Sequence, residues 1–548
     1  MQVKLKILSS LAKVFADEEP TEYPETGRPS GFKNETISFQ AAYRADTAGS
    51  EPARIEVESP IAERIRVRQV RLVPVGLAAF TDADDNYLRK TPGLYPDLLT
   101  DLKDGVVRLL GGQWSSLWID VEPDEEAAAG VYPVKIAIRT PQGEPLAERT
   151  VSVEILDALL PPQTLRNTNW FYTDCLAQYY QVPVFSERHW KIIENFAALA
   201  ARRGINMILT PAFTPPLDTA VGGERLTTQL VDVRLDQGAY SFGFEKLKRW
   251  VGMCGRAGIR YFEFSHLFTQ WGARSAPKVM ATVDGVYKKL FGWETAATDE
   301  EYKRFLREYL GALTPLLREW GIADRCYFHI SDEPSLEHLR DYKAAREIAA
   351  PYLQGFEIID ALSDFEFYKS GAISKPIPAN DHIAPFIEAG VKGLWTYYCV
   401  GQYKDVSNLF IAMPSARNRI FGVQLYKYGI EGILQWGYDF YNTQYSLDRI
   451  DPYAVTDAGG WVPSGDAFQV YPGRGGQPEE SIRLMVKAQA LYDLRAFRLL
   501  ESLTDKAFVL RLIEDGLSEP VTFSRYPKSD VYLLRLRNRV NREIMARI

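Results

Sequence analysis

Short runs of alternating apolar and polar residues fill the first 160 positions of the chain. Examples are ARIEVES, RIRVRQVRLVPV, SSLWIDVE and YPVKIAIRT, separated by Pro, Gly, Asp and Asn. An alternation of period two gives a strand one buried and one exposed face, and closely spaced turn residues favour hairpins. The pattern predicts an N-terminal antiparallel β-sandwich over residues 1–160.

The pattern changes after the segment LDALLPPQT. Pro161 and Pro162 cannot donate to a strand ladder, so we expect a linker there. Beyond it, apolar runs alternate with amphipathic stretches such as HWKIIENFAALAARRG, which is typical of repeated β-α units. The candidate strands are residues 167–172, 205–210, 259–264, 325–330, 355–360, 372–378, 393–398 and 432–438.

Eight strands of this kind are what a (β/α)8 TIM-type barrel needs. We therefore expect an α/β catalytic domain with this fold over residues 161–475. The span is longer than the roughly 250 residues of a minimal barrel, and the surplus falls in loops after strands, where barrels build their sites. Residues 476–548 contain the stretch SIRLMVKAQALYDLRAFRLLESL and predict a helical C-terminal extension packed on the barrel.

Composition excludes several classes of partner. The 548 residues carry a formal net charge of -7 with acids and bases interleaved, so no basic surface is expected to bind nucleic acid. No stretch is long and apolar enough to predict a membrane span. Lysines interrupt the first 15 residues, which therefore do not resemble a signal peptide. We expect a cytoplasmic protein, and the sequence does not indicate its oligomeric state.

The four cysteines bear on metal binding and on the redox compartment. Cys175, Cys254, Cys326 and Cys399 are far apart and have no histidines at ligand spacing. They therefore predict buried thiols in a reducing compartment rather than a disulfide framework or a metal site. We expect no metal and no cofactor.

The strongest candidate chemistry follows the fourth predicted strand, which continues into Ser331, Asp332, Glu333 and Pro334. Catalytic groups of such barrels lie at the C-terminal ends of the strands. Successive strand residues point to opposite faces, so both carboxylates can face one pocket only if the chain turns at Glu333. Two close carboxylates favour one protonated and one ionised group near neutral pH. The alternative is that Asp332 caps a helix beginning near Leu336 and that Glu333 lies in solvent.

A retaining glycosidase of the ordinary kind needs a second carboxylate about 5 Å from the acid. The seventh strand, where barrel glycosidases commonly carry that nucleophile, reads LWTYYCVGQ and contains no acid. Asp360, Asp381 and Asp439 are the remaining candidates near strand ends. A missing nucleophile is expected where the substrate's own 2-acetamido group attacks the anomeric carbon.

Aromatic residues concentrate near the same strand ends, and aromatic rings offer faces on which sugars stack. An aromatic barrel core is the competing interpretation of each ring. His266 is a candidate hydrogen-bond partner for a sugar hydroxyl, whereas His329 is expected to be structural. The predicted substrate-binding residues are Trp170, His266, Trp271, Tyr397, Tyr398, Trp436, Tyr438 and Asp439.

Four segments carry a family resemblance: YFHISDEPS, HLFTQWGARSAPKVMA, LQWGYDFYN and VYPG. Together they resemble the catalytic region of glycoside hydrolase family 123 and its relatives, the domain of unknown function 4091, over roughly residues 165–500. The resemblance implies a β-sandwich followed by a (β/α)8 barrel and a retaining β-N-acetylgalactosaminidase that uses substrate assistance. It also implies that Glu333 is the acid/base and that Asp332 stabilises the acetamido group of an oligosaccharide or glycoconjugate.

Two alternatives remain open at this point. One is a glycosidase that acts on a sugar without an acetamido group through a protein nucleophile such as Asp439. The other is a non-catalytic carbohydrate-binding protein that keeps the barrel and its aromatic rim. The adjacent Asp332 and Glu333 favour an enzyme over the second alternative.

Overall fold

The structure is a computed structural model that describes residues 1–21 and 27–548. Two sheets in which most neighbouring strands are antiparallel form the N-terminal region and enclose one hydrophobic core that includes Phe39, Leu117, Ile136 and Val153. This arrangement agrees with the alternating sequence pattern. The second sheet has the order β2 (Ser30–Phe32), β10 (Pro145–Leu156), β9 (Gly130–Arg139), β4 (Ser50–Glu58) and β7 (Val106–Leu110).

The first sheet contains two strands that come from far along the chain. Its order is β1 (Gln2–Ser9), β3 (Ile37–Asp46), β8 (Trp114–Val121), β5 (Ile65–Val75), β6 (Gly93–Asp101), β24 (Pro478–Ser481) and β23 (Val470–Pro472). Strand β24 pairs with β6 through Glu480 opposite Leu99 and Ser481 opposite Leu98. The β23–β24 hairpin crosses the predicted boundary at residue 475 and was not expected from the sequence.

Eight parallel strands form a nearly closed barrel, and each overlaps one predicted strand. The strands are buried along almost their whole length, as expected for a parallel sheet covered on both faces. A parallel bridge between Ala379 and Tyr397 connects the two edge strands. The order is β20 (Lys375–Ile377), β19 (Glu357–Ala361), β18 (Cys326–Phe328), β15 (Tyr261–Phe264), β12 (Met207–Thr210), β11 (Arg166–Asn169), β22 (Gly432–Gln435) and β21 (Trp395–Tyr397).

Helices separate successive barrel strands. The two longest, α2 and α4, begin at polar caps, since Ser186 accepts from the His189 backbone N and Asp299 accepts from the backbone N of Glu301 and Tyr302. The layer of helices around the barrel is thin after β19 and β20, where each helix has only five residues. The helices are α1 (Thr173–Tyr179), α2 (Glu187–Arg202), α3 (Glu245–Ala257), α4 (Glu300–Glu319), α5 (Leu339–Ala349), α6 (Phe365–Lys369), α7 (Ala384–Glu388), α8 (Ser415–Arg419) and α9 (Phe421–Lys427).

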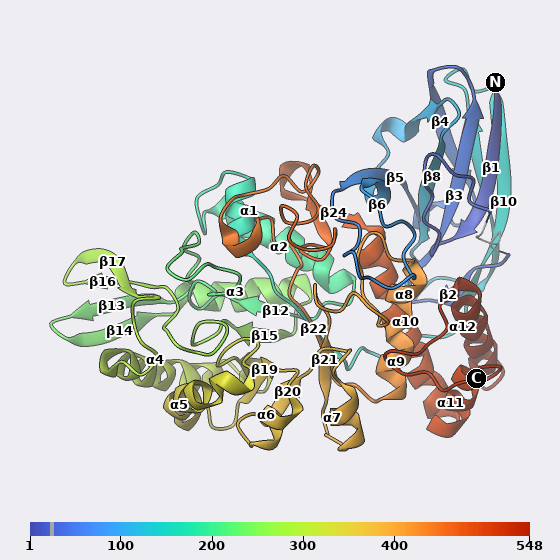
Figure 1. The fold of residues 1–548 in the computed structure, drawn as a ribbon. Helices are drawn as coiled ribbons and strands as arrows, with labels where there is room; N and C mark the ends of the chain where they lie inside the picture. The colour runs from blue at the N-terminus through green and yellow to red at the C-terminus, as the bar shows by residue number, and fades with distance from the viewer. Residues whose placement is uncertain (22–26) are drawn as a thin grey trace.

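Long segments after β12 and β15 build a small additional sheet that the sequence did not predict. Its order is β14 (Ala239–Gly243), β13 (Asp232–Asp236), β16 (Val279–Val283) and β17 (Val286–Phe291). Figure 1 shows this sheet at the end of the molecule opposite the N-terminal sheets. The surplus length of the barrel region thus lies in segments after strands, as expected.

The C-terminal region is helical, as predicted, and packs beside the barrel (Figure 1). It comprises α10 (Ile482–Leu503), α11 (Lys506–Glu514) and α12 (Asp530–Met545). Fifteen of the 22 residues of α10 are buried, and the helix contacts α8, α9, β6 and β24. No helix in the described ranges has the length and apolarity needed to cross a bilayer.

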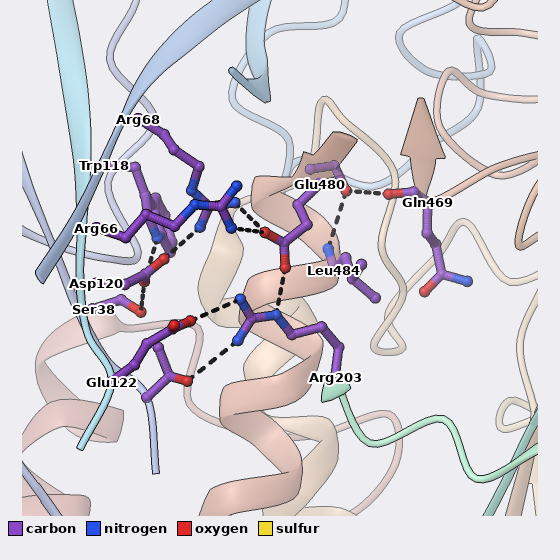
Figure 2. A network of polar contacts seen from close by, with 12 residues as sticks. Ser38, Arg66, Arg68, Trp118, Asp120, Glu122, Arg203, Gln469, Glu480 and Leu484 are labelled. Atoms are coloured by element: carbon purple, nitrogen blue, oxygen red, sulfur yellow. Dashed lines mark hydrogen bonds and ion pairs between the residues drawn. The ribbon is translucent and has the colours of Figure 1, made fainter. Parts of the chain in front are cut away.

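A cluster of buried charges joins the N-terminal sheets to the barrel. We call Arg68, Asp120, Arg203 and Glu480 the interface clamp. Glu480 on β24 binds both Arg68 on β5 and Arg203 at the end of α2, and Arg68 also pairs with Asp120 on β8 (Figure 2). Burial alone would raise the pKa of Glu480, but the two arginines hold it below its ordinary value. The clamp therefore fixes three distant segments of the chain to one another.

Candidate active site

Asp332 and Glu333 lie at the C-terminal end of β18 and line one pocket. Glu333 has a φ of 44°, so the chain turns at this residue, as two consecutive side chains facing one pocket require. The alternative role for Asp332 as a helix cap does not hold, because Ser335 caps the turn Leu336–His338.

The pocket lies at the mouth of the barrel and draws on seven of the strand ends or following loops there. Its acidic side chains are Asp218, Asp332 and Glu333, and its walls are largely aromatic. Such a mixture suits a sugar, because rings cover its apolar faces and carboxylates accept from its hydroxyl and amide groups. The remaining lining residues are Trp170, Tyr172, Leu217, Gln270, Trp271, Ala361, Tyr397, Cys399, Val400, Leu434, Trp436 and Trp461.

Tyr397 contacts one of the two adjacent carboxylates directly. Its hydroxyl donates to Glu333 Oε1 at 2.5 Å. Glu333 stands at the pocket mouth and is partly open to solvent, and withdrawal of its carboxyl from water raises its pKa while the Tyr397 hydrogen bond opposes that rise. Burial raises the pKa of Asp332 much further, the charge of Glu333 adds to the rise, and His329 opposes it. The pair therefore holds a shared proton at a higher pH than ordinary carboxyls would.

A buried triad lies beneath the pair. His329 Nε2 is 2.5 Å from Glu263 Oε1 and its Nδ1 is 3.0 Å from Asp360 Oδ1. Burial alone would lower the pKa of His329, but the hydrogen bonds and charges of Asp360 and Glu263 outweigh it and raise the pKa to about 10. His329 is therefore a cation at neutral pH. Glu263 also accepts from Trp170 Nε1 at 2.8 Å, which connects the triad to the pocket wall.

Comparisons with known proteins decide what class of site this is. A family model for the catalytic domain of glycoside hydrolase 123 matches residues 170–500, which is more than half of the chain. The chain belongs to glycoside hydrolase family 123. It is therefore an enzyme that hydrolyses glycosidic bonds, and its substrate is a glycan. A search of curated proteins found no match.

One solved structure supports the fold of this family 123 enzyme. A family 123 glycoside hydrolase from Clostridium perfringens, described in a study of glycolipid glycan hydrolysis, aligns with a TM-score of 0.76 and 14% identity over 100% of both chains. A putative β-galactosidase from Bacteroides fragilis aligns with a TM-score of 0.30 and 10% identity, covering 78% of this chain and 55% of that one. At these identities the first comparison shows a shared fold.

Four of the eight side chains predicted to bind substrate line the pocket of the family 123 enzyme. They come from three parts of the rim: Trp170 follows β11, Trp271 follows β15, and Tyr397 and Trp436 stand beside each other on β21 and after β22. Trp271 is 39% exposed and its backbone N donates to the Asp332 carbonyl at 3.0 Å.

The other four predicted binding residues are buried outside the lining. Tyr438 donates to the Phe196 carbonyl, and Tyr398 packs against Phe421. Asp439 accepts from the Tyr172 backbone N at 2.8 Å, which places it behind the pocket wall. His266 stacks on His329 with ring centroids 4.1 Å apart. None of these four side chains lines the pocket.

The structure also gathers three possible metal ligands that sequence spacing could not reveal. The ligand atoms of His266, His329 and Asp360 lie within 4.8 Å of one another. Both ring nitrogens of His329 already face carboxylates, so this imidazolium has no lone pair to offer a metal. Burial and the His329 charge hold the pKa of His266 well below its ordinary value, which leaves it neutral. The cluster fits a stacked neutral and charged histidine pair, and we assign it no metal.

Asp218, Gln270 and Trp461 line the pocket but were missed in the sequence. All three lie in long loops without a periodic pattern, where the sequence gives no signal that distinguishes a pocket residue from its neighbours. Glu263 did leave a signal, because an acid inside the apolar strand YFEF must be buried and paired.

Proposed function

We propose that the protein is a retaining β-N-acetylhexosaminidase of galactosamine type that uses substrate assistance. The observation that carries the proposal is that Asp332 and Glu333 share one turn at one pocket. Asp360, Asp381 and Asp439, the nucleophiles that the sequence offered, do not line it. Membership of family 123 supports the sugar class, since β-N-acetylgalactosaminidases are known from that family.

Glu333 serves as the acid and then as the base. It donates its proton to the leaving oxygen while the acetamido oxygen of the substrate attacks the anomeric carbon. This step breaks the glycosidic bond and forms a cyclic oxazolinium ion, which keeps the acetamido N–H proton. Glu333 then takes a proton from water as the water opens that ring at the same carbon. Two inversions at one carbon give overall retention.

Asp332 serves as the acceptor for the acetamido N–H. No group in the described part of the chain donates a hydrogen bond to its carboxylate, although the residue is only 8% exposed. A substrate N–H therefore supplies the donor that the site lacks. An anionic Asp332 also stabilises the positive charge that develops on the ring nitrogen and carbon of the oxazolinium ion.

Substrate binding also determines which of the two carboxyls, Asp332 or Glu333, carries the shared proton. In the free enzyme the Tyr397 hydroxyl favours an ionised Glu333. The acetamido N–H favours an ionised Asp332, because a hydrogen bond to the charged form lowers a carboxyl pKa. The proton of the pair then moves to Glu333, where the leaving oxygen needs it.

Leaving-group dependence tests the two roles separately. Glu333→Gln should lower kcat/KM on unactivated glycosides by about 10²–10⁴ and have little effect on intermediate formation from activated aryl glycosides. Asp332→Asn should lower kcat/KM on both substrates alike, by about 10²–10³. Glu337→Gln is the control, because Glu337 is exposed on the next turn of the same loop. Equal losses for Glu333→Gln on both leaving groups would contradict its role as acid.

One alternative keeps the glycosidase but not the substrate assistance. Asp218 is the third carboxylate of the pocket and is its candidate nucleophile. A covalent sugar on Asp218, detected by mass spectrometry of the intact protein with a fluorinated substrate, would establish this alternative.

A further inference from the structure

Asp218 occupies a fixed position on the pocket wall. It follows β12 in a long loop and has a φ of 40°. Its backbone N donates to Gln270 Oε1 at 2.7 Å, and its carbonyl accepts from Ser446 Oγ at 2.7 Å. These partners come from the loops after β15 and β22, so two neighbouring loops hold the backbone of Asp218 from both sides.

The carboxylate of Asp218 is not fully used by the protein. The residue is 8% exposed, and Oδ2 is buried without a hydrogen-bond partner among the described residues. Burial raises the pKa of Asp218 to about 6, while a backbone hydrogen bond from Tyr445 and the charge of Arg225 oppose the rise. Buried polar atoms are nearly always hydrogen-bonded in folded proteins, so an orphan oxygen in a pocket wall calls for a donor from outside the chain.

The nearest cation does not supply that donor. Arg225 is buried and donates through Nε and Nη2 to the carboxylate of Asp174 at 2.7–2.9 Å. Its Nη1 donates to the Leu217 carbonyl at 3.2 Å. Arg225 therefore anchors the start of the Asp218 loop while its own donors point to other acceptors.

We propose that Asp218 is a specificity-determining residue that accepts hydrogen bonds from ring hydroxyls of the sugar whose glycosidic bond is cleaved. This inference rests on the proposed function, in which Asp332 takes the acetamido group and Glu333 the leaving oxygen. The hydroxyls are the donors that remain on that ring. Asp218 reaches the pocket from β12, two strands around the barrel from β18, so it addresses a different part of the ring from the catalytic pair.

A carboxylate in this position gives sharp selectivity. Hydrogen bonds to a charged acceptor are about twice as strong as neutral ones. A sugar that lacks the matching hydroxyl would leave the Asp218 oxygen buried and unpaired, and sites built around a substrate hydroxyl reject such analogues strongly. The matched hydroxyl therefore contributes to binding and excludes other sugars.

A double-mutant cycle between enzyme and substrate tests the contact. The substrates are one aryl glycoside that the wild type hydrolyses and its 3-, 4- and 6-deoxy analogues. Asp218→Asn should lower kcat/KM on the parent by about 10- to 100-fold. One deoxy analogue should show a similar loss with the wild type, and combining the two changes should cost no more than either alone. The aryl leaving group has no hydroxyls, so the coupling locates the contact in the cleaved ring.

Asp439→Asn is the matched control, because Asp439 Oδ2 is also buried without a partner but does not line the pocket. Its effect should be the same for the parent and every deoxy analogue. Asp218→Ala is a second variant, which should give the same coupling if the asparagine side chain disturbs folding. Strictly additive losses for both Asp218 variants, or a covalent sugar on Asp218, would overturn the proposal.

The result of the double-mutant cycle can be distinguished from the result of the tests of the proposed function. The cycle needs only an aryl glycoside that the enzyme hydrolyses, whether or not the sugar carries an acetamido group. Coupling to Asp218 without acetamido dependence would leave this inference standing and remove substrate assistance. Acetamido dependence with additive losses would do the reverse.

Discussion

The interface clamp and the catalytic pocket both bury carboxylates, but only those of the clamp form ion pairs with arginines. Glu480 lies between Arg68 and Arg203, and these charges hold its pKa below the ordinary value despite burial. Asp332 is buried to a similar degree beside another acid, and its pKa is raised well above the ordinary value. Ion pairs with arginines therefore offset the cost of burying Glu480, whereas no ion pair offsets the cost of burying Asp332.

This difference separates a group that stabilises the fold from one that acts on a substrate. A paired buried charge contributes little to chemistry, but removing one partner is costly. An unpaired buried carboxyl costs stability and has a perturbed pKa, which is typical of catalytic sites. The clamp should therefore respond to mutation in stability and the pocket in activity.

Glu480→Gln should give the largest loss of stability. It leaves Arg68 and Arg203 buried without their shared acid, and breaking such a group costs about 3–5 kcal/mol of unfolding free energy. Urea unfolding measures the loss, and kcat/KM of the folded fraction should stay close to that of the wild type. Glu300→Gln, which removes an exposed pair with Lys303, is the control and should change stability little. A clamp variant with normal stability and lost activity would contradict the assignment of the clamp to stability and of the pocket to activity.

His329 shares a feature with each region: it is paired with carboxylates, as the charges of the clamp are paired, but it lies beneath the pocket. Its pKa of about 10 lies above the unfolded value near 6.5, so its contribution is fully present below pH 6.5 and is lost as pH rises through 10. His329→Gln should be less stable than the wild type at pH 6.5. The deficit should be smaller than that of Glu480→Gln, because Glu263 and Asp360 can take up protons.

The measurement is urea unfolding of wild type and His329→Gln from pH 6.5 to 10. The difference in unfolding free energy should shrink as the pH rises. A constant difference would mean that His329 is neutral in the folded protein and that its pairing with Glu263 and Asp360 is not ionic.

Trp436→Ala should give the smallest effect and acts on binding. Trp436 lines the pocket, and an aromatic contact is worth about 0.5–1.5 kcal/mol beyond the buried area. We expect KM to rise by about 10-fold with a smaller change in kcat, measured by steady-state kinetics. Trp250→Phe is the control, because Trp250 lies on the buried face of α3, does not line the pocket and should affect stability instead. Unchanged kinetics for Trp436→Ala would make Trp436 a packing residue.

Much of this architecture could be predicted because its signals are local. The barrel strands are apolar runs between amphipathic helices, and all eight overlap the predicted ranges. Asp332 and Glu333 were found because a strand end is a short, definable place, and the rim aromatics Trp170 and Trp271 because they follow such ends. The sequence alone could not distinguish the rings that line the pocket from those, such as Tyr438, that pack beneath it.

The remaining features depend on contacts between distant segments. Strands β23 and β24 have three and four residues and include Pro472 and Pro478. They pair with each other, and β24 pairs with β6 from the N-terminal region. Asp218 lies in the loop TPPLDTAVGG, where an acid normally means solvent. Its role depends on Gln270 and Ser446, which reach it from other loops.

In the proposed mechanism, the substrate's acetamido group performs the nucleophilic attack. The most direct measurement compares kcat/KM of the wild type on two aryl β-glycosides that share one leaving group and differ only at carbon 2, with an acetamido group or a hydroxyl. We predict turnover of the acetamido substrate, with a product whose initial anomeric configuration by NMR is retained, and no measurable turnover of the hydroxyl substrate. Comparable turnover of both substrates would contradict attack by the acetamido group.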